Sequence, residues 1–149
     1  MTASHLEALL PRLRGQDLRE ILGASRHETL QSWAAAKVSS AGVSLTLLVD
    51  GVPMICGGVL EGAVRGIGVL WLVGARGCER HIKHVLRVWR VIVKDGGFRR
   101  LECKCYAENE KANEFARRAG LRFEGGLTGY ALDGSTLNQY GLTGGQHGR

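Results

Sequence analysis

The sequence contains no apolar run long enough to cross a membrane. A membrane-spanning helix needs about 18 or more consecutive apolar residues, and no stretch of the 149-residue chain reaches that length. The N-terminal segment MTASHLEALL has an acidic residue where a secretory signal peptide would carry basic charge. We therefore expect no membrane span, no signal peptide, and a protein that is intracellular or packaged by an intracellular route.

The spacing of the cysteines does not suit a metal. The four cysteines are Cys56, Cys78, Cys103 and Cys105. They form no C-x-x-C pair and no close Cys/His cluster with zinc spacing. Cys103 and Cys105 lie two apart on one face of a predicted strand, where their side chains run parallel and cannot easily bridge each other. We expect reduced thiols that pack as small apolar side chains, and we assign no metal site.

Aromatic residues are missing where binding to nucleic acid would need them. The chain has a net charge of +6, and the predicted helix 80–94 carries five basic residues on one face, namely Arg80, Lys83, Arg87, Arg90 and Lys94. Such a face can follow a phosphate backbone, but it has no interleaved aromatic residues on which bases would stack. We therefore predict a solvated basic face and not a nucleic-acid site. The same charge would also suit acidic protein partners.

The remaining composition is that of an ordinary globular protein. Charged residues make up 23% of the chain and apolar residues 44%, and a chain of this length buries about two-thirds of its unfolded surface. The sequence shows no internal repeat and no linker. It predicts a single domain over residues 1–132, followed by a Gly-rich tail over residues 133–149 that is mobile or ordered only against a partner.

Three capping-box patterns predict a helical N-terminal quarter. In this motif the side chain of the cap residue accepts a hydrogen bond from the backbone amide of the third helical residue. The acidic side chain of that third residue accepts a hydrogen bond from the backbone amide of the cap residue. The three pairs are Ser4 with Glu7, Asp17 with Glu20, and Ser25 with Glu28. We expect a helix to start at each pair, and Leu18, Ile21 and Leu22 to form the apolar stripe of the second.

Alternating and helical patterns predict the rest of the fold. Strands are expected at residues 43–49, 53–60, 66–73 and 99–106, and Asp50-Gly51 is a strong hairpin signal between the first two. Residues 80–95 give the clearest amphipathic helix, with Trp89 on its buried stripe.

The segment from Arg99 to Gly125 has the most informative pattern. It predicts a strand, a helix capped by Asn109 and ended by Gly120, and a second strand over residues 121–124. An Asn after the strand, an Ala three residues on and a Gly-apolar pair closing the helix resemble the C-terminal half of the GCN5-related N-acetyltransferases.

Over residues 16–126 the chain resembles more narrowly the small acetyltransferase-like proteins of tailed phages, some of which are internal virion proteins. The resemblance rests on the segments DGVPMICGGVLEGAVRGIGVLWLVG and CERHIKHVLRVWRVIVKDGG. It implies an α/β fold of the α+β kind, with a mixed, mostly antiparallel sheet flanked by helices. We expect this fold to lack a full first strand, because only Met1 to Ala3 precede the first predicted cap. Phage structural proteins are the implied partners, and the host cytoplasm or the virion is the implied location.

The resemblance also implies acetyl-CoA as cofactor, with its pyrophosphate on the loop after residue 73. The implied cofactor-binding residues are Leu72, Val73, Gly74, Arg76, Gly77, Cys78, Arg80 and Asn109. The family pattern Gln/Arg-x-x-Gly-x-Gly/Ala, started at Arg76, has small residues where this chain has Glu79 and His81. We expect Glu79 to repel the phosphates unless Gly74 and Gly77 approach them instead.

The sequence assigns no catalytic residue. The family's Tyr, which protonates the departing thiolate, falls seven residues after Asn109, and this chain has Ala116 there. The candidates by chemistry are Tyr106 and Tyr130 as acids, and Glu61, His81 and His84 as bases. Each of these residues more often packs or faces solvent than it catalyses.

Two functions therefore stay open. The first is an acetyl-CoA-dependent N-acetyltransferase acting on an amine acceptor, with turnover put in question by the altered loop and by Ala116. The second is a non-catalytic phage virion or assembly component of the same fold. Fold resemblance does not choose between them, because function belongs to the site.

Overall fold

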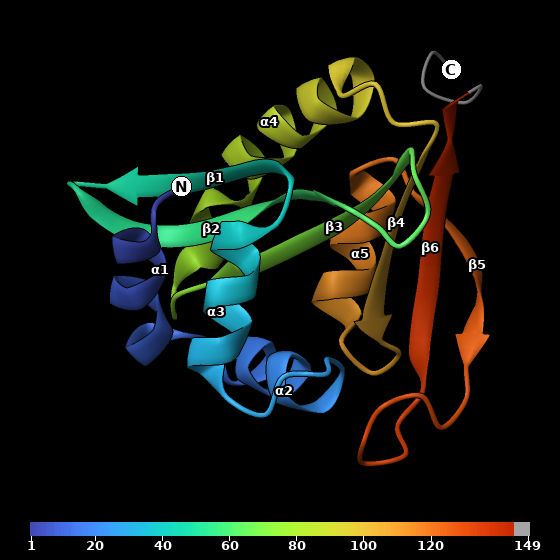
Figure 1. The fold of residues 1–149 in the computed structure, drawn as a ribbon, viewed down its shortest axis with the longest axis horizontal. Helices are drawn as coiled ribbons and strands as arrows, with labels where there is room; N and C mark the ends of the chain where they lie inside the picture. The colour runs from blue at the N-terminus through green and yellow to red at the C-terminus, as the bar shows by residue number, and fades with distance from the viewer. Residues whose placement is uncertain (145–149) are drawn as a thin grey trace. The chain divides into compact units, whose positions relative to one another are not determined.

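The computed structural model describes residues 1–144 (Figure 1), and the contacts within the chain divide them into two compact units. The first unit is Met1–Leu60 with Leu70–Ile82, and the second is Glu61–Val69 with the chain from Lys83 onward. The sheet has six strands in the order β1-β2-β3-β4-β6-β5, and strand β3 contributes residues to both units.

The first unit begins with helices and continues into strands. Its elements are α1 (Ala3–Leu9), the 3-10 turn η1 (Leu10–Arg12), α2 (Gly15–Gly23), α3 (Leu30–Ser39), β1 (Gly42–Val49), β2 (Val52–Glu61), the end of β3 (Ile67–Gly74) and the 3-10 turn η2 (Cys78–His81). The chain before β1 is helical, as expected for a fold without a full first strand. The core of the unit joins helices to strands through Leu6, Leu9, Trp33, Cys56 and Trp71.

The three N-terminal helices are confirmed, but their predicted caps are wrong. Helix α1 is capped by Thr2, whose hydroxyl accepts from the His5 amide, and α3 is capped by Thr29, whose hydroxyl accepts from the Ser32 amide. Helix α2 starts after Arg14 with no side-chain cap. A capping-box pair in the sequence marks a helix start only where the first residue has extended backbone angles, and here the residues with those angles lie a few positions away.

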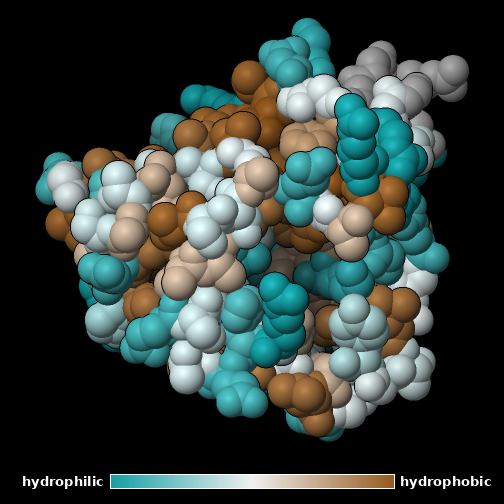
Figure 2. Space-filling model, viewed as in Figure 1, coloured by the Kyte–Doolittle hydropathy of each residue, from teal (hydrophilic) through white to brown (hydrophobic). Residues whose placement is uncertain are grey.

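The expected apolar stripe of α2 is only partly right. Ile21 is buried, but Leu18 and Leu22 are 37% and 39% exposed, while the polar Asp17 is buried. On the face shown in Figure 2, apolar surface is interspersed with hydrophilic surface, so single exposed leucines are ordinary here.

The hairpin between β1 and β2 is confirmed. Asp50 and Gly51 both have positive φ, at 50° and 77°, which is the geometry of the tight hairpin turn that matches strand twist. Val49 pairs with Val52 across the turn, and the ladder then continues from Leu47 and Ile55 to Gly42 and Leu60.

The second unit alternates strands and helices. After the start of β3 it contains α4 (Ile82–Asp95), β4 (Arg100–Tyr106), α5 (Glu110–Arg118), β5 (Arg122–Leu127) and β6 (Leu137–Thr143). Strand β3 pairs with β4 in parallel, and β6 pairs with β4 and with β5 antiparallel. The predicted strands and the helix at 80–95 therefore form where the sequence indicated.

The two helices of this unit follow their sequence signals. On α4, Leu86, Trp89 and Val93 are buried, and Trp89 meets the Phe115 ring edge-on with centroids 6.3 Å apart. On α5, the Asn109 side chain accepts a hydrogen bond from the Ala112 amide at 3.2 Å. Gly120 ends the helix with φ of 98°, a left-handed conformation that suits glycine.

The predicted tail is wrong over residues 137–143, which form strand β6. Leu137, Tyr140 and Leu142 are buried, and β6 is hydrogen-bonded along both edges (Figure 1). A Cβ atom at Gly141 would meet the ends of the flexible Glu124 and Arg100 side chains, which would have to shift. A Gly-rich, weakly alternating sequence is held as a strand because two neighbours satisfy its backbone. Residues 145–149 of the predicted tail lie outside the described residues.

The four cysteines are free thiols, three of them buried and Cys103 half-buried. Within residues 1–144, no helix is long and apolar enough to cross a membrane, and no three His, Cys, Asp or Glu side chains gather as a metal site.

We predict that Trp89→Ala lowers the free energy of unfolding by about 3–5 kcal/mol, because it removes a large buried side chain and leaves a cavity. Arg87→Ala, on the exposed face of the same helix, is the matched control and should change stability by less than about 0.5 kcal/mol. Urea unfolding followed by circular dichroism measures both. Equal losses would show that Trp89 does not anchor α4.

Candidate functional site

The candidate site is the loop Gly74–His81, which connects β3 to α4 through η2. Strand β3 pairs with β4 at Ile67, Gly68 and Val69, and the described ladder ends there although β3 continues to Gly74. Backbone groups along that last stretch of β3 therefore have no ladder partner on the β4 side among residues 1–144. A free strand edge of this kind pairs with extended ligands.

Two glycines give the loop its shape. Gly77 has φ of 85° and stands as the left-handed residue just before η2. A Cβ atom on Gly74 would collide with the Cys78 sulfur, so the loop closes tightly on itself only with glycine there. The Cys78 amide donates to the Ala75 carbonyl at 3.0 Å, which completes the turn.

Most of the loop's first amides are used by the protein itself. Ala75 N–H donates to the Met54 carbonyl at 2.9 Å, and Arg76 N–H donates to the Arg12 carbonyl at 3.0 Å. The Gly77 amide, by contrast, has no acceptor among the described residues. Gly77 and the side chains of Arg76 and Arg80 are exposed, so these are the loop groups that face an anion arriving from solvent.

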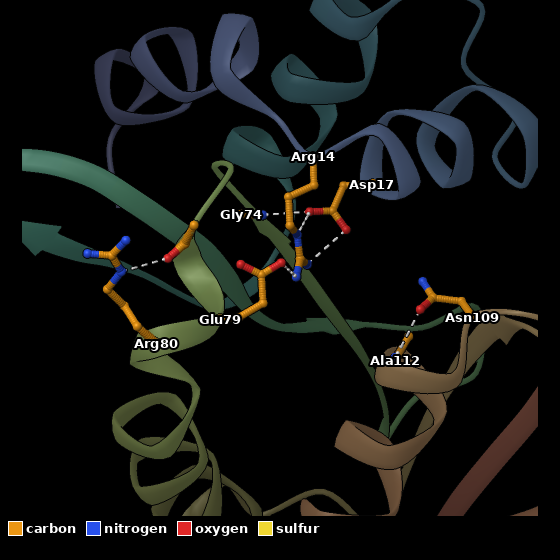
Figure 3. A network of polar contacts seen from close by, with 8 residues as sticks. Arg14, Asp17, Gly74, Glu79, Arg80, Asn109 and Ala112 are labelled. Atoms are coloured by element: carbon orange, nitrogen blue, oxygen red, sulfur yellow. Dashed lines mark hydrogen bonds and ion pairs between the residues drawn. The ribbon is translucent and has the colours of Figure 1, made fainter.

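The start of α2 holds the loop through Arg14 and Asp17 (Figure 3). One Asp17 oxygen accepts from the Gly74 amide at 2.8 Å and from Arg14 Nε at 2.9 Å, and the other accepts from Arg14 Nη2 at 3.0 Å. The Arg14 amide donates to the Gly74 carbonyl at 3.0 Å. Arg14 Nη1 also lies 3.5 Å from a Glu79 carboxylate oxygen. We call these four residues the loop clamp.

Burial changes the acid–base properties of this region. Asp17 is only 4% exposed, and burial raises its pKa against the opposing effect of Arg14. Burial also raises the pKa of the Cys78 thiol. Cys78 is therefore a neutral packing group here, as expected for the cysteines of this chain, and not a thiolate.

Seven of the eight predicted cofactor-binding residues lie in the first unit, on β3 and its loop. Leu72 is half-buried, Val73, Gly74 and Cys78 are buried, and Arg76, Gly77 and Arg80 are exposed. Arg80 Nε donates to the Gly77 carbonyl at 3.2 Å, which orients its side chain along the turn. Asn109 lies in the second unit, where its side chain caps α5.

The candidate catalytic residues do not form a catalytic set. Ala116 is 3% exposed on α5 and offers no hydroxyl. Tyr106 is buried and Tyr130 is 54% exposed, with the Lys104 ammonium 5.8 Å from its ring centre. Glu61 and His84 are exposed and His81 is half-buried. These placements assign none of the candidates as a general acid or base.

Sequence reasoning missed three groups that the structure brings out. Arg14 and Asp17 hold the loop, but the Asp17-x-x-Glu20 spacing pointed to a helix cap instead. Lys37 lies over the rings of Trp33 and Trp71, with its nitrogen 5.6 Å and 5.4 Å from their centres, and burial lowers its pKa. The pairs Arg14/Asp17 and Trp33/Lys37 have local helical spacing, but their contacts with Gly74 and Trp71 are long-range and are visible only in the structure.

We predict that Asp17→Asn changes how stability depends on pH. The pKa of Asp17 is raised in the folded protein, so its stabilising contribution is fully present below the ordinary Asp pKa of about 4 and is lost as pH rises through the folded pKa. The stability of the wild type relative to Asp17→Asn should therefore fall as pH rises through this window, as measured by urea unfolding at several pH values.

Glu124 provides the opposite control. Its pKa is lowered by its hydrogen bonds to Arg100, so its contribution is present above the ordinary Glu pKa and is lost as pH falls. The stability of the wild type relative to Glu124→Gln should rise with pH in the acidic range. The same slope for both variants would contradict our assignment for Asp17.

No protein-family model matches the chain, and no curated protein matches it significantly in sequence. Solved structures match it in fold. A probable acetyltransferase of the GNAT family from Chromobacterium violaceum is 18% identical, with a TM-score of 0.75 over 98% of this chain and 86% of that one. A ribosomal-protein-alanine N-acetyltransferase from Brucella melitensis is 17% identical, with a TM-score of 0.72 over 96% of each chain.

A third match is AAC(6')-Ib in complex with ribostamycin and coenzyme A, at 16% identity and a TM-score of 0.70 over 100% of this chain and 93% of that one. At such identities the likeness shows the fold alone. The fold is the one of GCN5-related N-acetyltransferases, a mixed and mostly antiparallel sheet flanked by helices, as the sequence predicted.

Proposed function

We propose that this protein is an acetyl-CoA-dependent N-acetyltransferase that binds the cofactor's pyrophosphate at the loop Gly74–His81. The observation that carries the proposal is the geometry of this loop. A strand with a free edge leads into a glycine turn whose Gly77 amide and two arginines, Arg76 and Arg80, face solvent. Amides and guanidinium groups gathered at a turn before a helix suit phosphate oxygens.

The edge of β3 beyond its ladder with β4 suits the pantetheine arm of the cofactor. The pantetheine arm of acetyl-CoA is extended and contains two amide groups. Residues Leu72 and Val73 lie on the stretch of β3 beyond the ladder with β4. Successive residues of a strand present their backbone groups to opposite edges. Because the Ala75 amide bonds the Met54 carbonyl of β2, Val73 also faces β2, and Leu72 presents the backbone groups that are suited to pair with pantetheine amides.

The Arg14 contact gives Glu79 a role that the sequence did not suggest. We expected its carboxylate to repel phosphate, but it lies 3.5 Å from Arg14, so part of its charge is offset. Arg14 in turn is shared between Glu79 and Asp17. The positive charge that remains for the cofactor therefore comes from Arg76 and Arg80.

The proposed reaction is acetyl transfer to an amine acceptor. The acceptor nitrogen attacks the thioester carbonyl, a C–N bond forms and the C–S bond breaks. The amine loses one proton and the departing thiolate gains one, so that the proton count balances. Because Ala116 has no hydroxyl, we assign the protonation of the thiolate to water. Because none of the candidate bases within residues 1–144 is assigned, we assign the deprotonation of the acceptor to water as well.

The alternative is a non-catalytic component of a phage virion or of its assembly. Ala116 at the expected Tyr position and the resemblance of residues 16–126 to phage proteins favour it. The similar structures reported above are acetyltransferases and give the phage reading no support.

We predict that coenzyme A binds, that added salt weakens the binding, and that Arg80→Ala weakens it about tenfold, the loss expected for one hydrogen bond to a charged group. Glu79→Gly should tighten binding, because it removes a negative charge and releases Arg14. Isothermal titration calorimetry measures all of these. Arg87→Ala removes the same charge from the exposed face of α4 and should leave the affinity unchanged.

If neither the wild type nor Glu79→Gly binds at millimolar concentrations of coenzyme A, the acetyltransferase proposal is wrong. Co-purification with phage structural proteins would then favour the alternative. If coenzyme A binds, release of free thiol in the presence of amine acceptors tests turnover.

A further inference from the structure

Asp17 is an unusual residue to find in the core of the first unit. Among residues 1–144, only Asp17 and Asn113 are buried polar residues, each 4% exposed. An ionised carboxylate is costly to remove from water, and a buried ion pair often contributes less to stability than apolar residues of the same size. Stability alone is therefore a poor reason to place a carboxylate here.

The contacts of Asp17 are concentrated on the loop. Its carboxylate accepts a hydrogen bond from the Gly74 amide at 2.8 Å and orients the Arg14 guanidinium through two further hydrogen bonds. Arg14 then reaches Glu79, on the other side of the Gly77 turn. Asp17 thus fixes the beginning of the loop directly and its end through Arg14 (Figure 3).

The neighbouring backbone reinforces this arrangement. Leu13 and Ala75 form an antiparallel bridge, and the amides of Arg14 and Arg76 donate to the carbonyls of Gly74 and Arg12. The segment before α2 therefore runs alongside the loop, joined to it by this isolated bridge. A carboxylate at the first turn of α2 is also favourably placed at the positive end of that helix.

We propose that Asp17 is a positioning residue for phosphate recognition: it holds the loop through Arg14 and Gly74 so that the Gly77 amide and the arginines Arg76 and Arg80 face the cofactor's pyrophosphate. The inference rests on the proposed function of this loop. Asp17 itself does not touch the cofactor. Arg14 is likewise assigned to the clamp and not to the phosphates, because two carboxylates already occupy its guanidinium.

The test compares two fragments of the cofactor. Adenosine 3′-phosphate 5′-diphosphate carries the pyrophosphate, whereas acetyl-pantetheine carries the thioester arm without it. Asp17→Asn should weaken binding of coenzyme A and of the nucleotide fragment by about tenfold, because the loop loses internal support worth about one charge-assisted hydrogen bond, and should change binding of acetyl-pantetheine by less than twofold. NMR titration measures the affinity of each fragment.

A double-mutant cycle tests whether Asp17 and Arg14 act through the same clamp. Arg14→Gln should cause the same selective loss, and the double variant Asp17→Asn with Arg14→Gln should be no worse than either single variant, because both act through one clamp. The double variant also leaves no unpaired buried charge, so it stays folded if Asp17→Asn alone does not. Tyr140→Phe, which removes a buried hydroxyl bonded to Asn113 in the second unit, controls for a general loss of stability.

Hydrogen exchange of the Gly74 amide gives a readout without ligand. Its protection should fall in Asp17→Asn and stay unchanged in Tyr140→Phe. Unchanged protection, or equal losses for the two cofactor fragments, would overturn the positioning role while leaving the proposed function intact. If the wild type binds neither coenzyme A nor the nucleotide fragment, the proposed function fails and this inference fails with it.

Discussion

The first unit depends on how the backbone of Gly74 is held. The Gly74 amide donates a hydrogen bond to the Asp17 carboxylate, and the Gly74 carbonyl accepts one from the Arg14 amide. Each such hydrogen bond contributes about 1 kcal/mol net, but leaving either buried partner unsatisfied costs more. Because both partners come from the start of α2, the position of the loop after β3 is set by a helix some sixty residues earlier in the chain.

This arrangement also sets the charge balance of the candidate site. Arg14 is neutralised by Asp17 and Glu79, so the loop has a modest excess of positive charge despite its arginines. The phosphate recognition that we propose for this loop depends on the direction of backbone amides as much as on charge. A rigid clamp is consistent with this, because an amide is useful only when its direction is fixed.

The sequence predicted the fold class and the main elements because their signals are local. Alternation identified β4, helical spacing identified α4 with Trp89 buried, and Asp50-Gly51 identified the hairpin. Helix caps were misplaced by a few residues, since the cap depends on backbone angles that a residue pair does not fix. The pairing of Asp17 with Gly74 was missed because the two residues are distant in sequence and form no motif.

Strand β6 was missed for a related reason. Its residues Leu137, Tyr140 and Leu142 do not alternate regularly, and Gly141 suggested a loop. The strand exists because β4 and β5 both need a partner. The predicted cofactor-binding residues came from the family resemblance. The structure adds that Arg76, Gly77 and Arg80 are the ones exposed to solvent on the loop.

The place of β6 between β4 and β5 has a consequence for how the second unit folds. Strand β6 follows both of its partners in sequence, and within residues 1–144 the described ladders give β5 no partner except β6. The edge of β4 that faces away from β3, and the edge of β5 that β6 covers, therefore stay unpaired until residues 137–143 have left the ribosome. During synthesis these edges are exposed to pairing with other chains, so β6, the last strand within residues 1–144, also limits aggregation.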